Sequence, residues 1–225
     1  MRKLSELEII IYPCAITHVE TRDPVTALTF DDGPHPVYTP RVLNILEKHG
    51  IRATFFMVGE AASRYPEIVR IAVEAGHVIG NHCWNHLNLT QIRSRLRRLK
   101  QLWAGSRATA PYCQRLFRPP YGGINDQVRF DALMLRYKVI LWSASAQDWI
   151  PQGSEEIARK MIERITPGSI FLLHDAIYRS QLAETQWDRG PMLEGLDKAL
   201  AVLKRQIHFL TVPELLRTGR SVCNW

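Results

Sequence analysis

The chain has 225 residues, of which 46% are hydrophobic and 23% are charged, and its net charge is +7. That length and composition exclude a low-complexity or fibrous protein and are typical of one globular domain with a sizeable core. The positive charge raises the question of a nucleic-acid partner. No aromatic-rich basic stripe or nucleic-acid-binding motif accompanies it, so we expect none.

The first segment of the chain has a positively charged start but lacks the features of an export leader. Glu6 and Glu8 place negative charge in it, and Pro13 breaks its apolar run. A secretory leader needs about 7–15 apolar residues followed by a small-residue cleavage site. No stretch reaches the ~20 apolar residues of a membrane span. We therefore expect no signal peptide in this segment and no transmembrane segment.

Seven short runs of β-branched and aromatic residues predict strands, at 25–30, 53–58, 77–82, 115–120, 138–143, 169–175 and 208–213. Patterns typical of helices lie between them, at 39–50, 65–76, 91–103, 154–165 and 194–206. This alternation predicts an α/β protein with a parallel sheet. Because no glycine-rich phosphate loop follows the first run, we expect a barrel rather than an open, doubly wound sheet.

The helix predicted at 91–103 is unusually basic. Its apolar residues recur at helical spacing, at Ile92, Leu96, Leu99 and Trp103, and its basic residues fall mostly between them, at Arg93, Arg95, Arg97, Arg98 and Lys100. The pattern indicates an amphipathic helix with a basic outer face. Two interpretations stay open, a solvated face or a docking surface for an anionic polymer.

Polar residues gather where the predicted strands end. They are Asp31 and Asp32, His82 and His86, Arg118 to Tyr121, Asp148 and Trp149, and His174 and Asp175. In a barrel of parallel strands the active site lies at the carboxyl ends of the strands. Each group alone has an ordinary explanation as a turn, a surface charge or a buried histidine. Their common position predicts one functional site.

Two of these groups indicate a metal site. Successive side chains of an extended segment point to opposite sides, so Asp31 and Asp32 are expected to have different roles. His82 and His86 have the i, i+4 spacing that lets one turn of helix present two imidazoles to one metal. Two histidines and a carboxylate leave a coordination position open, which is typical of catalytic sites, and zinc is the usual ion.

The four cysteines are widely spaced, at Cys14, Cys83, Cys113 and Cys223, and no CxxC pair occurs among them. This spacing gives no support to a zinc ribbon or a thioredoxin-type motif. Two alternatives remain. All four thiols are reduced, or Cys14 and Cys223 form a bridge between the termini in an oxidising compartment.

The motifs TFDDGP, HxxxH, RPPYGG, DW and LLHD follow one another in this order. In this combination the sequence resembles the polysaccharide deacetylases, the NodB-homology domain of carbohydrate esterase family four, over about residues 25–215. The resemblance implies a single distorted (β/α)7-8 barrel. It also implies a metal-dependent hydrolase that removes acetyl groups, usually from N-acetylglucosamine units.

The resemblance implies specific roles at the metal site. Asp32, His82 and His86 would bind one divalent ion, Zn2+ in the first instance, with Co2+, Ni2+ or Mn2+ as alternatives. Asp31 would be the general base, and Arg118 would pair with it and hold it in place. A bound cation polarises the acetyl carbonyl and acidifies water, which gives these residue types a physical reason to occur together.

The same resemblance implies the remaining roles. Asp148 would orient His174, which would act as general acid toward the departing amine. The backbone N–H of Tyr121 would face the oxyanion. Trp149 and Leu172 would line the pocket that receives the acetyl methyl group.

Two positions depart from the family pattern. Cys83 stands where a serine or threonine usually follows the first metal histidine, and Ser145 stands where many members have an aspartate. Neither position carries a role in the chemistry described above.

The expected substrate is an acetylated polysaccharide or oligosaccharide, of the peptidoglycan or chitin type. Alternatives are an O-acetyl esterase acting on acetylated xylan and a non-catalytic glycan-binding module. The expected organisation is an N-terminal extension at 1–24, a catalytic domain at 25–215 and a C-terminal tail at 216–225. The resemblance favours an extracellular or envelope location, and the sequence indicates no oligomeric state.

Overall fold

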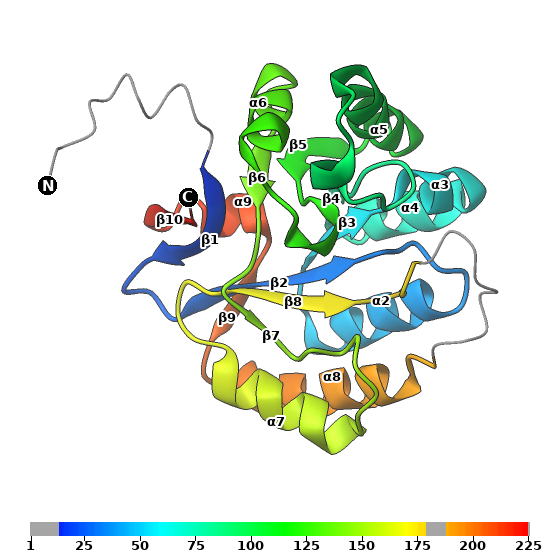
Figure 1. The fold of residues 1–225 in the computed structure, drawn as a ribbon. Helices are drawn as coiled ribbons and strands as arrows, with labels where there is room; N and C mark the ends of the chain where they lie inside the picture. Colours follow the sequence, from blue (N-terminus) through cyan, green and yellow to red (C-terminus); the bar gives the residue numbers. More distant parts are fainter. Residues whose placement is uncertain (1–13, 179–187, 225) are drawn as a thin grey trace, which may run out of the picture.

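The computed structural model describes residues 14–178 and 188–224 (Figure 1). The strands are β1 (Ala15–Glu20), β2 (Val25–Asp31), β3 (Thr54–Met57), β4 (Val78–Asn81), β5 (Cys113–Phe117), β6 (Lys138–Ile140), β7 (Ala144–Ser145), β8 (Ile170–His174), β9 (His208–Leu210) and β10 (Arg220–Asn224). The α-helices are α2 (Tyr38–His49), α3 (Gly59–Arg64), α4 (Pro66–Glu74), α5 (Arg95–Ala108), α6 (Asp126–Met134), α7 (Ser154–Arg164), α8 (Gly190–Leu203) and α9 (Val212–Leu215).

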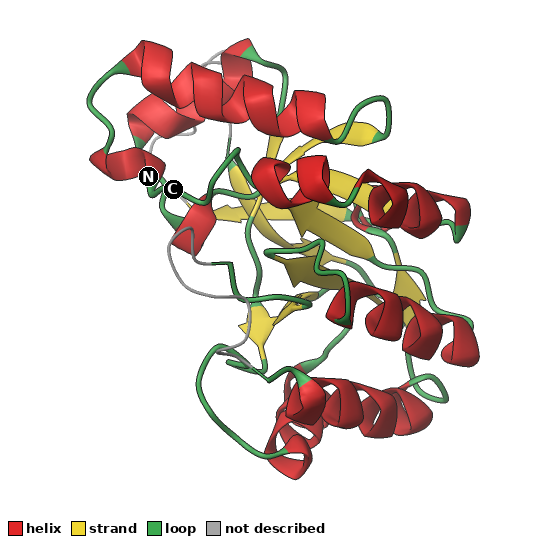
Figure 2. Ribbon diagram, turned by 90° about the vertical axis from the view of Figure 1, so that its right-hand side faces the viewer, coloured by secondary structure: helices red, strands yellow, loops and turns green. Residues whose placement is uncertain are grey.

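The strands form one curled sheet, a half-barrel, in the order β10-β1-β6-β5-β4-β3-β2-β8-β7, with β9 also paired to β2. Among the described strands every ladder is parallel except β1 with β10. Figure 2 shows the strands as an inner layer with helices around the outside. The predicted α/β class with a distorted barrel is therefore confirmed.

The central strands are buried on both faces, which explains their continuous apolar runs. All seven residues of β2 are buried. In β3 the neighbours Phe55 and Phe56 belong to different clusters of the core: Phe55 packs on the helix-covered side, and Phe56 packs with Ala27 and Ile170. A strand with both faces packed in this way is held firmly in register, and its carboxyl end is a rigid support for functional groups.

All seven predicted strands are present, although several are shorter than their apolar runs. The five predicted helices are present as α2, α4, α5, α7 and α8. The sequence patterns did not predict β1, β7, β10, α3, α6 or α9. These missed elements are mostly short or lie outside the regular alternation, so their periodicity is too weak to detect.

The predicted apolar face of α5 was wrong. Leu96 and Trp103 are 64% and 57% exposed, whereas Arg98 is only 3% exposed. Arg98 donates from Nε to Asp131 Oδ2 at 2.6 Å and from Nη1 to two backbone carbonyls and a glutamine. A buried carboxylate on α6 therefore draws this arginine inward, and the helix is rotated relative to its apolar stripe.

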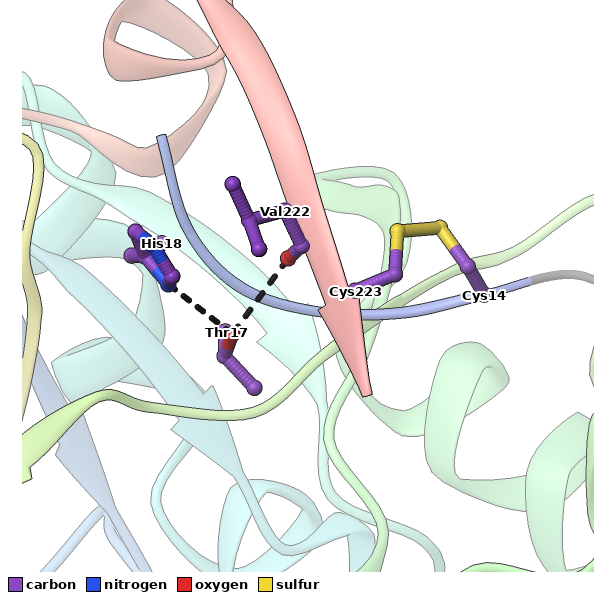
Figure 3. Close-up of a disulfide and its surroundings, with 5 residues drawn as sticks. All are labelled: Cys14, Thr17, His18, Val222 and Cys223. Atoms are coloured by element: carbon purple, nitrogen blue, oxygen red, sulfur yellow. Dashed lines mark hydrogen bonds between the residues drawn. A yellow bond between two sulfur atoms is a disulfide. The ribbon is translucent and has the colours of Figure 1, made fainter. Parts of the chain in front are cut away.

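The two ends of the described chain lie side by side. β1 and β10 form the antiparallel ladder at one edge of the sheet, and Cys14 and Cys223 form a disulfide across it (Figure 3). Thr17 donates a hydrogen bond to the carbonyl of Val222 beside the bridge. Of the two alternatives left open by the sequence, the structure therefore has the bridge between the termini, and Cys83 and Cys113 are free.

Residues 1–13 of the expected N-terminal extension lie outside the described residues. In the remainder, no helix combines the length and apolarity that a membrane crossing requires.

Candidate active site

A cavity of about 350 Å³ opens at the carboxyl ends of the central strands. Twelve residues line it. Eight were predicted as site residues, Asp31, Asp32, His82, His86, Tyr121, Trp149, Leu172 and His174, and four were not, Gly122, Trp142, Ile177 and Tyr178. Arg118 and Asp148 lie behind this wall as hydrogen-bond partners of Asp31 and His174. The predicted site residues are thus brought together by the fold.

The pairing of β2 with β8 places a carboxylate and an imidazole of the site next to each other. Strands β2 and β8 lie side by side (Figure 1), and in their ladder Asp31 lies opposite His174. Both residues line the cavity, so a carboxylate and an imidazole reach it from adjacent strands. At Asp32 the backbone turns into the left-handed region, with φ 78°. This change of direction at the end of β2 gives the two neighbouring carboxylates different surroundings.

Asp32, His82 and His86 form a cluster whose ligand atoms all lie within 4.8 Å of one another. Asp32 Oδ1 is 3.3 Å from His82 Nε2 and 3.1 Å from His86 Nε2. Burial raises the pKa of Asp32, but the two imidazoles outweigh this effect and hold the pKa well below its usual range. The carboxylate is therefore ionised and faces the Nε2 atoms of two imidazoles.

The orientation of these groups is fixed by a second set of contacts. His82 Nδ1 donates to the backbone carbonyl of Arg118 at 2.7 Å, which leaves Nε2 with a free lone pair toward Asp32. The other carboxylate oxygen, Asp32 Oδ2, accepts the backbone N–H of Tyr178 at 3.0 Å. The Tyr178 hydroxyl in turn bonds Glu60, at the start of α3.

The predicted helical turn between His82 and His86 was wrong. The segment is an irregular turn in which Cys83 and His86 have φ values of 66° and 56°. Asn81 stabilises it, because its Oδ1 accepts the Cys83 N–H and its Nδ2 donates to a carbonyl of α5. Gly105 lets α5 approach this closely, since a Cβ there would lie 2.4 Å from Asn81 Oδ1.

Left-handed backbone is concentrated at the site. Six non-glycine residues have positive φ in the described chain, and five are site residues or their neighbours: Asp32, Cys83, His86, Tyr121 and Gln147. Such conformations persist where the surrounding structure enforces them, and they cluster at functional sites.

Arg118 is completely buried and holds Asp31. Its Nη1 donates to Asp31 Oδ1 and to the Thr29 hydroxyl, both at 2.8 Å, while Nε and Nη2 donate to carbonyls of 140 and 141. Its guanidinium lies 4.2 Å from the ring centroid of Phe56. All three guanidinium nitrogens therefore donate hydrogen bonds, and the Asp31 carboxylate is held in one orientation.

Asp148 and His174 form the second charged pair. Asp148 Oδ1 accepts His174 Nδ1 at 2.9 Å, and Oδ2 accepts the His174 backbone N–H at 2.8 Å. Burial lowers the pKa of His174, but the Asp148 carboxylate more than offsets this and the pKa is raised to about 9. With Nδ1 bound to Asp148, the proton on Nε2 is the one available to a molecule in the cavity.

Aromatic rings complete the wall of the cavity. The Trp149 ring meets His174 edge-on, with centroids 5.4 Å apart, and the Tyr121 ring lies 4.6 Å from that of His86. Tyr121 is 69% exposed at the mouth, whereas Leu172 is buried at the base. The cavity thus has an apolar floor and an aromatic rim beside its charged groups.

Sequence reasoning missed several contributors. Thr29 lies two residues before Asp31 on the same face of β2, so period-two spacing could have indicated it. Trp142 lies near the end of the strand predicted at 138–143, and this position was a further signal. Arg189 and Tyr178 carry no motif, and only the fold brings them to Asp148 and Asp32.

The two departures from the expected motifs lie beside the site. Cys83 is completely buried, and burial raises the pKa of its thiol, so it remains uncharged next to His82. Ser145 lies in β7 opposite Leu172. Neither takes the place of a group described above.

A curled sheet that carries two histidines and a carboxylate at its rim, between two carboxylate–cation pairs, defines a class of hydrolase. The chain belongs to the polysaccharide deacetylase family, whose model matches residues 18–140. The peptidoglycan-N-acetylglucosamine deacetylase of Bacillus cereus is 37% identical over 204 residues, which cover 88% of this chain and 91% of the relative. The chitooligosaccharide deacetylase of Sinorhizobium fredii is 36% identical over 191 residues, or 83% and 86%.

Solved structures agree with this assignment. A crystal structure of a peptidoglycan N-acetylglucosamine deacetylase, Bc1960, superposes with a TM-score of 0.83 at 28% identity and covers 96% of this chain and 98% of its own. The family and the type of enzyme predicted from the motifs are confirmed.

Proposed function

We propose that this protein removes N-acetyl groups from N-acetylglucosamine-containing polysaccharide, of the peptidoglycan or chitin type, and releases acetate. The observation that carries the proposal is the grouping of the Asp31–Arg118 and Asp148–His174 pairs around the cluster of Asp32, His82 and His86. An acid and a base on either side of a cation site are what amide hydrolysis requires.

The cluster fits a divalent metal ion. Asp32 Oδ1 is buried without a hydrogen-bond partner, although the Nε2 atoms of His82 and His86 are close to it. A cation held by these three atoms would satisfy the buried oxygen, and two imidazoles with one carboxylate suit Zn2+, with Co2+, Ni2+ or Mn2+ as alternatives. When bound, such an ion polarises the acetyl carbonyl and lowers the pKa of water.

Asp31 is proposed as the general base. Its Oδ1 is bound to Arg118, and its Oδ2 lies 3.8 Å from His82 Nε2, at the metal cluster. A water molecule near the cluster could therefore give its proton to this carboxylate as it attacks the acetyl carbon. Arg118 keeps the carboxylate oriented.

His174 is proposed as the general acid. Its Nδ1–H is bound to Asp148, so Nε2 delivers the proton to the departing amine nitrogen. The positive imidazolium that this role requires is stabilised by the Asp148 carboxylate. The backbone N–H of Tyr121 is proposed to face the oxyanion, and Trp149 and Leu172 to hold the acetyl methyl group against the apolar floor.

The choice of substrate follows the relatives, which include a peptidoglycan-N-acetylglucosamine deacetylase and a chitooligosaccharide deacetylase. An O-acetyl esterase acting on acetylated xylan would use the same groups but needs less help from the acid, because an alkoxide leaves more readily than an amine nitrogen that has not been protonated. A non-catalytic glycan-binding module would be expected to lack the base, the acid or a ligand, and this chain retains all of them.

Acetate release distinguishes these functions. We would assay N-acetylchitooligosaccharide, peptidoglycan and acetylxylan with metal-loaded protein and with chelator-treated protein whose metal content is checked by elemental analysis. The proposal predicts release from an N-acetylated glycan that chelation abolishes and Zn2+ restores. Release from acetylxylan alone would favour the esterase, and no release from any of the three would favour the binding module.

The catalytic domain is proposed to span 25–215, with flanking segments at 1–24 and 216–225. β1 and β10 come from the flanking segments and pair with each other at one edge of the sheet. This pairing supports the proposal that the flanking segments extend the sheet of the catalytic domain. An extracellular or envelope location is proposed with it, because disulfides such as Cys14–Cys223 persist in oxidising compartments.

A further inference from the structure

Arg189 is a buried cation behind the cavity, directly before α8, and no motif marks it. It is 3% exposed. We propose that Arg189 is a positioning residue that fixes Asp148 and His174 in their working arrangement and moderates the charge of Asp148. This inference rests on the proposed function, because it concerns the residue that would donate the proton.

The contacts of Arg189 join the two residues of the pair. Its Nη1 donates to the Asp148 carbonyl at 2.7 Å, and Nη2 donates to Asp148 Oδ2. Nη2 and Nε also donate to the His174 carbonyl, at 2.8 and 3.2 Å. One rigid guanidinium thus holds a side chain and two backbone carbonyls, from the loop after β7 and from the end of β8.

The geometry assigns each oxygen of Asp148 a different task. Oδ1 accepts only the His174 ring N–H, whereas Oδ2 accepts the His174 backbone N–H and Arg189. Without Arg189, the Asp148 carboxylate would keep only the two hydrogen bonds that His174 itself donates. The side chain that ties this pair to the segment before α8 would then be lost, and the direction of the His174 ring would be less fixed. A displacement of about 1 Å at a catalytic group can cost about 10²-fold in rate.

The charge of Arg189 has a second effect, with a definite sign. A cation beside Asp148 offsets part of the negative potential that the carboxylate exerts on His174. Removing it should raise the pKa of His174, and removing the Asp148 charge should lower it. The other charged groups that act on His174, Asp31 and Asp32, are unchanged by either substitution, and so is its chain neighbour Asp175.

The test compares Arg189→Met, Arg189→Lys and Asp148→Asn in zinc-loaded protein with equal metal content. For Arg189→Met we expect kcat/KM for an N-acetylchitooligosaccharide to fall about 10–100-fold. We also expect the alkaline limb of its pH profile to move up by about 0.5–1 unit. Asp148→Asn should move that limb down. Arg189→Lys keeps the positive charge but cannot reach all the acceptors of the guanidinium. Its alkaline limb should therefore stay at the wild-type pH, and its kcat/KM should lie between those of Arg189→Met and the wild type.

Arg98 provides a matched control. It has the same 3% exposure and also donates to a buried carboxylate and to backbone carbonyls. However, it belongs to α5, and its carboxylate partner belongs to α6. Arg98→Met should lower the free energy of unfolding without moving the alkaline limb. Titration of the His174 ring by NMR, with its signal assigned from its absence in His174→Gln, gives a readout that does not depend on turnover.

The outcomes separate this inference from the proposed function. If Arg189→Met leaves the alkaline limb and the His174 titration unchanged, or moves them down, Arg189 is only a packing residue. If Arg189→Met, like Arg98→Met, only lowers the free energy of unfolding, the inference is equally wrong. If instead the wild-type protein releases no acetate from any N-acetylated glycan, the proposed function fails, while the NMR titration still decides the effect of Arg189 on His174.

Discussion

Asp31 and Asp32 are adjacent in sequence but contact different partners. Asp31 binds Arg118, and Asp32 faces His82 and His86. We expect Asp32→Asn to lose metal together with turnover, because it removes the only anionic ligand of the cluster. Asp31→Asn should retain metal while turnover falls by orders of magnitude, because it removes only the base. Metal content by elemental analysis and rate, measured on both variants, test this.

The reverse result, with metal lost from Asp31→Asn and kept by Asp32→Asn, would show that the two roles are exchanged. Near-normal rate and metal content in both variants would mean that the pair only forms a turn.

His174 differs from the two aspartates because its contribution depends on the leaving group. We expect His174→Ala to reduce the rate of amide hydrolysis by about 10²–10⁴-fold, since the departing amine needs a proton. The loss should be smaller on an activated O-acetyl ester, whose leaving group departs without one. Parallel rate measurements on an N-acetylated oligosaccharide and on such an ester provide the comparison. Equal losses on both substrates would contradict the acid role.

The pH profile gives an independent measure of the same residue. A general acid works while it is protonated, and the pKa of His174 is raised to about 9, so activity should fall as the pH rises through the pKa of this imidazole. Asp148→Asn removes the anion that raises this pKa, so the alkaline limb of kcat/KM should move to lower pH. An alkaline limb that stays in place in Asp148→Asn would show that it reports another group.

At the scale of the elements, α5 shows how a tertiary contact overrides a helical pattern. Arg98 is drawn inward by Asp131, whereas Arg93, Arg97 and Lys100 lie on the exposed side. Leu96 and Trp103 lie exposed among these cations, and the guanidinium of Arg107 lies 5.1 Å from the Trp103 ring centroid.

If this exposed face docks an anionic polymer, activity on that polymer should fall as salt screens the attraction, while activity on a short neutral oligosaccharide stays constant. Combined replacement of Arg93, Arg97 and Lys100 by glutamine should abolish the difference. Assays between low and high ionic strength on both substrates test it. Salt curves of the same slope for the two substrates would leave this face as a solvated surface.

At the scale of the whole molecule, the Cys14–Cys223 disulfide closes a loop of 209 residues. A crosslink over such a separation restricts the unfolded chain, and we expect Cys14→Ser with Cys223→Ser to lower the free energy of unfolding by about 2–5 kcal/mol. The active site is at the rim of the sheet, away from this edge, so metal binding should be retained. Denaturant unfolding of both forms, with and without reductant, measures the difference. Identical stability would mean that the β1–β10 pairing alone holds this edge.

The sequence by itself determined the alternation of strands and helices and the strand ends that carry polar residues, and its family resemblance implied the cluster of Asp32, His82 and His86. It could do so because apolar periodicity and short-range motifs are local properties of a chain. The alternation of side chains along a strand predicted that the two carboxylates differ in role, whereas the choice of Asp32 as ligand and Asp31 as base came from the resemblance.

Only the tertiary structure decided which distant residues form hydrogen bonds to the residues of those motifs. Arg189 reaches Asp148 across 41 positions and Tyr178 reaches Asp32 across 146, so no spacing rule connects them. The turn between His82 and His86 also escaped prediction, because Asn81 and the close approach of α5 at Gly105 impose left-handed backbone where the spacing alone suggests a helix. Contacts between distant segments depend on how the whole sheet curls, and that is decided by the packing of the complete chain rather than by any one segment of it.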